Sequence, residues 1–170
     1  GYIITGSRGL SVGGVHYNDV LLIKTDASGT LQWEQTFGGS GDDVGHFVQQ
    51  TSDGGYIIGG YTCSFGAANC DVYLIKTDAS GTLQWENTFG GSGDDVGFSV
   101  QQTSDGGYII AGRTNSFGAG GYDVYLIKTD ASGTLQWENT FGGSGDDRGY
   151  SVQQISDGVY IIAGYTGSSG

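Results

Sequence analysis

The chain repeats itself with a period of 52 residues, and this feature limits its possible architectures more than any other. Trp33, Trp85 and Trp137 lie 52 residues apart. Residues 19–70 and 71–122 differ at 10 of 52 positions. A fixed period of this length is typical of proteins in which each repeat is one supersecondary unit. We therefore divide the chain into residues 1–18, interpreted as the last strand of a preceding repeat plus a loop, and three repeats at 19–70, 71–122 and 123–170.

Each repeat contains four short segments with the pattern of β-strands. In the second repeat these are residues 71–77, 82–89, 96–103 and 108–112, and the first two are predicted to form a hairpin. The turns between them carry Asp, Ser and Gly, in a chain with 35 glycines and no proline. In the third segment Val96, Phe98 and Val100 alternate with other residues and are expected to share one face. The sequence therefore predicts an all-β fold of tandem four-stranded antiparallel units.

The last strand of each unit is apolar on both faces, as in Tyr108–Gly112. A sheet with two apolar faces cannot bury its own surface and must stack on a neighbour. Stacking around an axis favours blades of β-propeller type. Thirteen strands do not fill the four to eight four-stranded blades that are usual, so we expect an incomplete ring, or one completed by further blades or by oligomerisation. A stacked solenoid or filament and a β-trefoil are the alternatives, although this apolar pattern occurs four times, where a trefoil needs three.

The blade pattern resembles known propeller families. The succession of Tyr108–Gly112, Asp123–Ile127 and Trp137 is similar to kelch and quinoprotein-like (PQQ-type) repeats. Residues 89–112 also look like FG-GAP repeats, with Phe-Gly first, Gly-Phe-Ser-Val next and Tyr-Ile-Ile-Ala-Gly last. Thr103–Gly107 stands where FG-GAP repeats carry their acidic calcium loop, so the resemblance implies blade geometry and no calcium role.

Paired carboxylates in glycine-rich loops are candidate metal ligands. Such pairs occur once per repeat, at Asp42 and Asp43, at Asp94 and Asp95, and at Asp146 and Asp147. Calcium takes six to eight oxygen ligands, and adjacent residues in an extended loop point apart. We interpret the pairs chiefly as loop-stabilising residues and retain calcium as the second hypothesis, with no other cofactor expected.

The two cysteines belong to one loop of the repeat at 19–70. Cys63 and Cys70 stand where the next repeat has Asn115 and Tyr122. Their joint appearance predicts a disulfide across the base of the loop, which indicates an oxidising compartment. Two free thiols are the alternative.

Catalytic motifs are not apparent in the sequence. Nucleophilic catalysis needs a nucleophile beside a base that a third group orients. His46 occupies the position of Phe98 and Tyr150, which indicates an aromatic slot, and His16 lies in a variable loop. Glycosidase chemistry needs two carboxyl groups about 5–10 Å apart, but no pair stands out. We expect that the chain is not an enzyme.

The net charge of −12 limits the partners. Eighteen acidic residues, six in each repeat, face only six basic ones. Such a surface repels phosphate backbones, so no nucleic-acid partner is expected. No stretch approaches the length of about 20 apolar residues that a membrane span requires.

Together these features predict a non-catalytic extracellular or cell-surface module that serves as a scaffold for protein or carbohydrate binding. Tyr61, Arg113 and Tyr165 occupy one equivalent position and differ between repeats, as do the loops at 12–18, 63–70 and 115–122. This variation is typical of a contact surface. The alternative is a self-assembling structural element, a ring or a filament, formed by self-association or with further blades. A fragment of a propeller-based hydrolase is the third hypothesis.

Overall fold

The computed structural model describes residues 1–156 and 158–168, and all of their regular structure is β-sheet. The strands are β1 (Ile3–Val12), β2 (Val15–Thr25), β3 (Leu31–Phe37), β4 (Asp43–Gln50), β5 (Tyr56–Thr62), β6 (Asp71–Thr77), β7 (Leu83–Phe89), β8 (Asp95–Gln102), β9 (Tyr108–Thr114), β10 (Asp123–Thr129), β11 (Leu135–Phe141), β12 (Asp147–Ser156) and β13 (Val159–Thr166). The strands predicted for the second repeat are therefore confirmed within one or two residues at most ends. Within the described ranges there is no helix long and apolar enough to cross a membrane.

The strands form four antiparallel sheets. Their orders are β1-β2-β3, β4-β5-β6-β7, β8-β9-β10-β11 and β12-β13. Each four-stranded sheet takes its first two strands from one sequence repeat and its last two from the next, so the sheets are offset from the repeats. By this equivalence β1, β2 and β3 match the second, third and fourth strands of a complete sheet, and β12 and β13 match the first and second.

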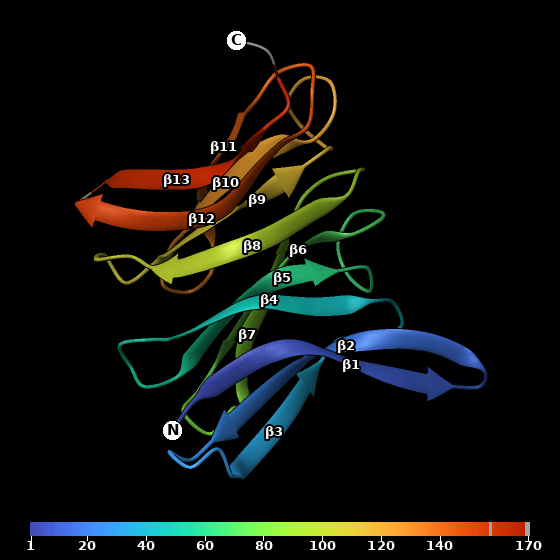
Figure 1. Ribbon diagram of the computed structural model, residues 1–170, viewed down its shortest axis with the longest axis vertical. Coiled ribbons are helices and arrows are strands. Elements are labelled where there is room, and N and C mark those ends of the chain that lie inside the picture. Colours follow the sequence, from blue (N-terminus) through green and yellow to red (C-terminus); the bar gives the residue numbers. More distant parts are fainter. Residues whose placement is uncertain (157, 169–170) are drawn as a thin grey trace.

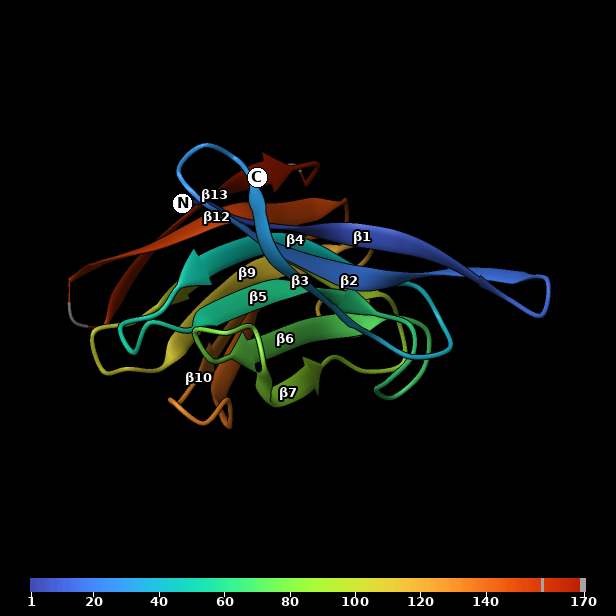
Figure 2. The same ribbon diagram turned by 90° about the horizontal axis from the view of Figure 1, so that it is seen from below.

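The four sheets follow one another along the long axis of the molecule (Figure 1). The series is open, with the β1-β2-β3 sheet at one end and the β12-β13 sheet at the other, and it does not close into a ring. Seen along that axis, the sheets overlie one another (Figure 2). The prediction of repeated four-stranded antiparallel sheets is thus confirmed, and the described sheets form no closed ring.

Apolar side chains fill the spaces between successive sheets. The central cluster joins Ile57, Val72, Leu74 and Phe89 of one sheet to Val100, Tyr108, Ile110, Tyr125 and Ile127 of the next. Two further clusters lie on either side of it, one built around Val20, Leu22 and Tyr73, and one around Ile109, Leu126 and Val152. β5 and β9 are buried along almost their whole length because they face a neighbouring sheet on both sides.

Acidic side chains stabilise the turns between strands. Asp78 accepts hydrogen bonds from the backbone N–H groups of Ser80 (2.8 Å) and Thr82 (2.9 Å). Gly81 then adopts a φ of +83°, which suits glycine. Asp53 accepts a bond from the buried Lys76 ammonium at 2.8 Å, which lowers the pKa of Asp53 to about 2.

Two expectations of local structure are wrong. Residues 15–18, placed in a loop by the sequence, extend β2, which pairs with β1 up to the Gly13–Gly14 turn. Val96, Phe98 and Val100 do not share a face, because a β-bulge between Gly97 and Ser99 adds one residue to β8 and reverses the alternation beyond it.

Candidate functional site

A row of aromatic side chains crosses three successive sheets and is formed by the bulged residues. His46, Phe98 and Tyr150, here called the aromatic row, occupy the same bulge position in β4, β8 and β12. The bulged residue has no cross-strand partner. The ring centroids of His46 and Phe98 are 5.3 Å apart, and the planes of these two rings are nearly parallel. The ring centroids of Phe98 and Tyr150 are also 5.3 Å apart. The interpretation of His46 as an aromatic-slot residue agrees with this packing.

The variable position predicted as a contact surface lies beside the aromatic row. The Tyr61 ring lies 5.6 Å from the His46 ring. The Arg113 guanidinium lies 5.9 Å from the Phe98 centroid and 4.1 Å from that of Tyr122, close enough for cation–π attraction. Tyr165 is 55% exposed and stands opposite Arg148 in the register of β13 and β12. Sequence reasoning found this position but missed its connection with the aromatic row.

A groove of 310 Å³ opens next to these side chains. Its lining residues are Asp42, Tyr61, Cys63, Cys70, Asp94, Val96 and Arg113. The groove combines aromatic, cationic and carboxylate groups that are all partly accessible. Five of its residues stand at positions that differ between repeats, although most of the sequence is shared: Tyr61, Cys63, Cys70, Val96 and Arg113.

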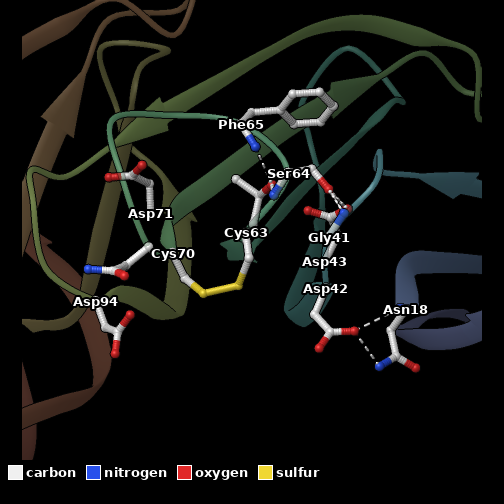
Figure 3. Close-up of a disulfide and its surroundings, with 12 residues drawn as sticks. Asn18, Gly41, Asp42, Asp43, Cys63, Ser64, Phe65, Cys70, Asp71 and Asp94 are labelled. Carbon is white, nitrogen blue, oxygen red and sulfur yellow. Dashed lines mark hydrogen bonds between the residues drawn. A yellow bond between two sulfur atoms is a disulfide. The ribbon is translucent and has the colours of Figure 1, made fainter. Parts of the chain in front are cut away.

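The predicted disulfide is confirmed and borders this groove. Cys63 and Cys70 are joined, with Cα atoms 4.2 Å apart (Figure 3). The bond closes a short exposed loop. Loop-closure entropy assigns such a bond roughly 2–3 kcal/mol of stabilisation relative to the reduced unfolded chain.

The adjacent acidic residues point apart, as Figure 3 shows for Asp42 and Asp43. Oδ1 of Asp42 accepts bonds from the backbone N–H and the side-chain amide of Asn18, each at 2.9 Å. Asp43 is buried, and its Oδ2 accepts bonds from Gly39 N–H (2.9 Å) and the Ser64 hydroxyl (2.6 Å). Asp95 makes the same bonds in the next sheet, to Gly91 and Ser116.

The third pair repeats this division of roles. Oδ1 of Asp146 accepts a bond from Tyr122 N–H, and Oδ2 of Asp147 accepts bonds from Gly143 N–H and the Ser168 hydroxyl. In residues 1–156 and 158–168 there is no group of three or more His, Cys, Asp or Glu side chains that could hold a metal ion. Calcium binding by the six acids stays a prediction, and hydrogen bonds hold one carboxyl oxygen of the buried Asp in each pair.

Each buried Asp instead lies beside an Asp of another strand, a pairing that the sequence did not reveal. A Cβ atom built on Gly90 would lie 2.1 Å from Oδ1 of Asp71 and 2.4 Å from Oδ2 of Asp95, so the two carboxyl groups flank this glycine. Oδ1 of Asp71 is buried without a hydrogen-bond partner in the protein. Burial, and then the charge of Asp95, raise the pKa of Asp71.

We expect Asp71→Asn to raise the midpoint of thermal unfolding at pH 7 by about 2–4 °C. A carboxyl group whose pKa is raised by folding stabilises the fold below its unfolded pKa and loses that contribution as the pH rises through the folded pKa. The amide can still accept the Ala67 N–H bond, which measures 2.8 Å. The gain should therefore shrink when thermal unfolding is followed at pH 3.5.

Asp78→Asn is the matched control, with the opposite sign. Hydrogen bonds from Ser80 and Thr82 lower the pKa of Asp78, so its carboxylate stabilises the fold at pH 7 and ceases to do so as the pH falls through its folded pKa. This variant should unfold at a lower temperature than the wild type at pH 7. A fall in the midpoint for Asp71→Asn at pH 7 would contradict the prediction, because it would mean that the negative charge of Asp71 stabilises the fold.

Comparison with known proteins shows a distant similarity. No protein-family model matches the chain. The sequence is 26% identical over 173 residues to the regulatory protein FlaEY of Caulobacter vibrioides. The match covers 86% of this chain and 18% of FlaEY, so the chain spans less than a fifth of that relative's length. The fold and this similarity together define a repeat β-sheet protein distantly similar to FlaEY.

Proposed function

We propose that the chain is a non-catalytic extracellular or cell-surface repeat module that binds a protein or carbohydrate ligand through the aromatic row and the adjoining groove. One observation carries the proposal: substitutions between otherwise near-identical repeats gather on this surface. The aromatic row reads His, Phe, Tyr, and the position beside it reads Tyr, Arg, Tyr. Tyr and Arg are also the side chains that contribute most to binding at protein interfaces.

The architecture supports a scaffold role and a blade interpretation. Successive sheets present equivalent positions at regular intervals, so each repeat adds one set of side chains to an extended surface, as in other repeat proteins. We regard the sheets as β-propeller-type blades similar to kelch and PQQ-type repeats, because they are four-stranded, antiparallel and stacked face to face. The disulfide supports an oxidising, extracellular location. The name of FlaEY, a regulatory protein, is compatible with a role exerted through contacts.

The proposal is tested by exchanging residues between equivalent positions. The double variant Tyr61→Arg with Arg113→Tyr puts at each position a residue that the neighbouring repeat already accommodates, so the fold should be preserved. Wild type and variant are screened on a glycan array and against a displayed peptide library. We expect the wild type to select a ligand and the variant to bind it at least tenfold more weakly, with an unchanged unfolding midpoint.

A second exchange serves as the control. Asn87→Gln copies a difference between repeats on β7, outside the groove, and should leave binding unchanged. Equal binding by wild type and the Tyr61/Arg113 variant would refute the proposed surface. A wild type that selects neither glycans nor peptides would refute the ligand class.

A further inference from the structure

Two pockets of equal size recur one repeat apart, on the sheets β4-β5-β6-β7 and β8-β9-β10-β11. Each has a volume of about 350 Å³. The first is lined by Phe65, Tyr73, Glu86, Asn87 and Thr88, and the second by their equivalents Phe117, Tyr125, Glu138, Asn139 and Thr140. None of these residues lines the groove beside the aromatic row. The pockets are therefore a separate feature that the repeat builds twice.

Each pocket lies beside an interface between two described sheets. Tyr73 belongs to the apolar cluster that includes Val20 and Leu22 of the β1-β2-β3 sheet. Tyr125 belongs to the cluster that includes Val72 of the β4-β5-β6-β7 sheet. Both tyrosines are only 1% exposed, so the core fixes their rings in place.

A buried tyrosine orients the glutamate of each pocket. The Tyr73 hydroxyl donates a hydrogen bond to Oε2 of Glu86, and Tyr125 donates to Glu138 in the same way. Burial, and then the hydrogen bond and charge of Glu86, raise the pKa of the Tyr73 hydroxyl. The hydroxyl therefore stays protonated and remains a donor. Glu86 itself is exposed, so its carboxylate is accessible to a ligand.

A partly exposed phenylalanine forms one wall of each pocket. Phe65 is 41% exposed and Phe117 is 40% exposed. Their ring centroids lie 5.9 Å and 5.8 Å from those of Tyr73 and Tyr125, at the same interplanar angle of 52°. The geometry is thus the same in both pockets, although only the loop of Phe65 is closed by a disulfide. An aromatic ring beside a carboxylate is a combination that attracts cations.

The charge around each pocket is negative. Besides Glu86, the carboxylates of Asp43 and Asp19 raise the pKa of Tyr73, and the second pocket has the equivalent arrangement. None of the described residues that line either pocket is basic. A cleft lined by one sign of charge concentrates the field and attracts the opposite charge. The volume is near the lower limit for small-molecule sites, which suits one small group.

We propose that each of the two pockets binds one organic cation, an ammonium or guanidinium group, which pairs with the glutamate carboxylate and lies against the phenylalanine ring. Tyr73 and Tyr125 are positioning residues that hold the glutamates in place. The cation belongs to a free amine or to a lysine or arginine side chain of a partner, and the chemistry recognised is the same. The pockets share no residue with the groove proposed for ligand binding, so either proposal can fail alone.

Glu86→Gln tests the first pocket, with the second pocket as a control in the same molecule. Glutamine has the same shape and can accept the Tyr73 hydrogen bond, so the variant should fold. Two-dimensional NMR follows the β7 and β11 amides during titration with butylammonium or with an end-blocked Gly-Gly-Lys-Gly-Gly peptide. We expect the wild type to respond on both strands. Glu86→Gln should bind at least about tenfold more weakly at β7, with binding at β11 unchanged.

Three further measurements separate the contributions of ring and charge. Phe65→Leu keeps an apolar wall without the ring and should weaken binding about threefold at β7 alone. The same peptide with an Nε-acetylated lysine is neutral and should shift neither strand. Glu34→Gln removes an equal charge from β3, where Glu34 already pairs with Arg8 at 2.7 Å and Gly13 replaces the phenylalanine. This variant should bind at both pockets like the wild type.

The relative affinities of the two probes identify the source of the cation. Tighter binding of the peptide than of butylammonium assigns the cation to a partner polypeptide, and equal or weaker binding of the peptide assigns it to a free amine. Either result supports the pockets. Equal weakening at both strands by Glu86→Gln would show non-specific attraction to an acidic chain and would overturn the proposal. An equal response to the acetylated peptide, or no response on either strand, would also overturn it.

Discussion

Ile109→Ala is expected to lower the free energy of unfolding by about 3 kcal/mol. Ile109 lies on β9 and is fully buried in the cluster between the third and fourth sheets. Its truncation removes apolar surface from the core and leaves a cavity that strands held on both edges cannot close. Urea denaturation followed by circular dichroism measures the change as a lower midpoint with a similar slope.

Ile161→Ala is the matched control, because Ile161 is the same residue in the equivalent strand of the next repeat. Ile161 lies on the last sheet, which has no described sheet beyond it, and is 55% exposed. Its truncation should cost less than about 1 kcal/mol when measured at concentrations where the chain is monomeric. Equal costs for the two variants would contradict the stacked arrangement, since the sequence around both residues is Tyr-Ile-Ile-Ala-Gly.

A comparison of Ile109 with Ile161 also shows what the periodicity of the sequence can and cannot predict. The apolar run at 108–112 predicted a strand buried on both faces, and β9 is such a strand. The same run at 160–164 gives a largely exposed strand. The local pattern is identical in both places, and only the presence of a neighbouring sheet decides the burial. Burial in repeat proteins is set by nearest neighbours, which lie about one period away in the sequence.

The bulges explain why part of the candidate site could not be predicted. Strict alternation placed Phe98 on one face with Val96 and Val100, but the bulge at Gly97 leaves Phe98 unpaired and free to stack on His46. The signal available in the sequence was weak: a glycine precedes an aromatic residue or a histidine at each of the three positions. Without the bulge, the variable residues Tyr61 and Arg113 could not be connected to the aromatic row.

The buried Asp pairs were missed for a different reason. Asp71 and Asp95 each begin a strand, and the sequence showed both as recurring residues. Their proximity depends on Gly90, which brings the end of β7 close to both carboxyl groups. A contact between residues 24 positions apart follows from the path of the chain between the strands, and no local pattern records that path.

Gly112→Ala is expected to destabilise the protein by about 3 kcal/mol, as strongly as the loss of a core isoleucine. Gly112 pairs with Gly97 beside the β8 bulge. A Cβ atom on Gly112 would lie 1.9 Å from the carbonyl oxygen of Val96. Since this oxygen belongs to the backbone, no rotamer change relieves the overlap, and the two strands must separate. Urea denaturation should show the loss, with the aromatic row of the same bulge disturbed in near-ultraviolet circular dichroism.

Gly6→Ala tests whether glycine is required at this position because the first strand of the sheet approaches it closely. Gly6 is the equivalent of Gly112 in β1, where no strand corresponding to β8 is paired, and a Cβ there meets nothing within 4 Å. The substitution should be neutral, or slightly stabilising because alanine restricts the unfolded chain more than glycine does. A large loss at Gly6 would show that the glycine is needed for its backbone conformation. A loss at Gly112 alone assigns the requirement to the close approach of the bulged strand, which is the same feature that sets the aromatic row in place.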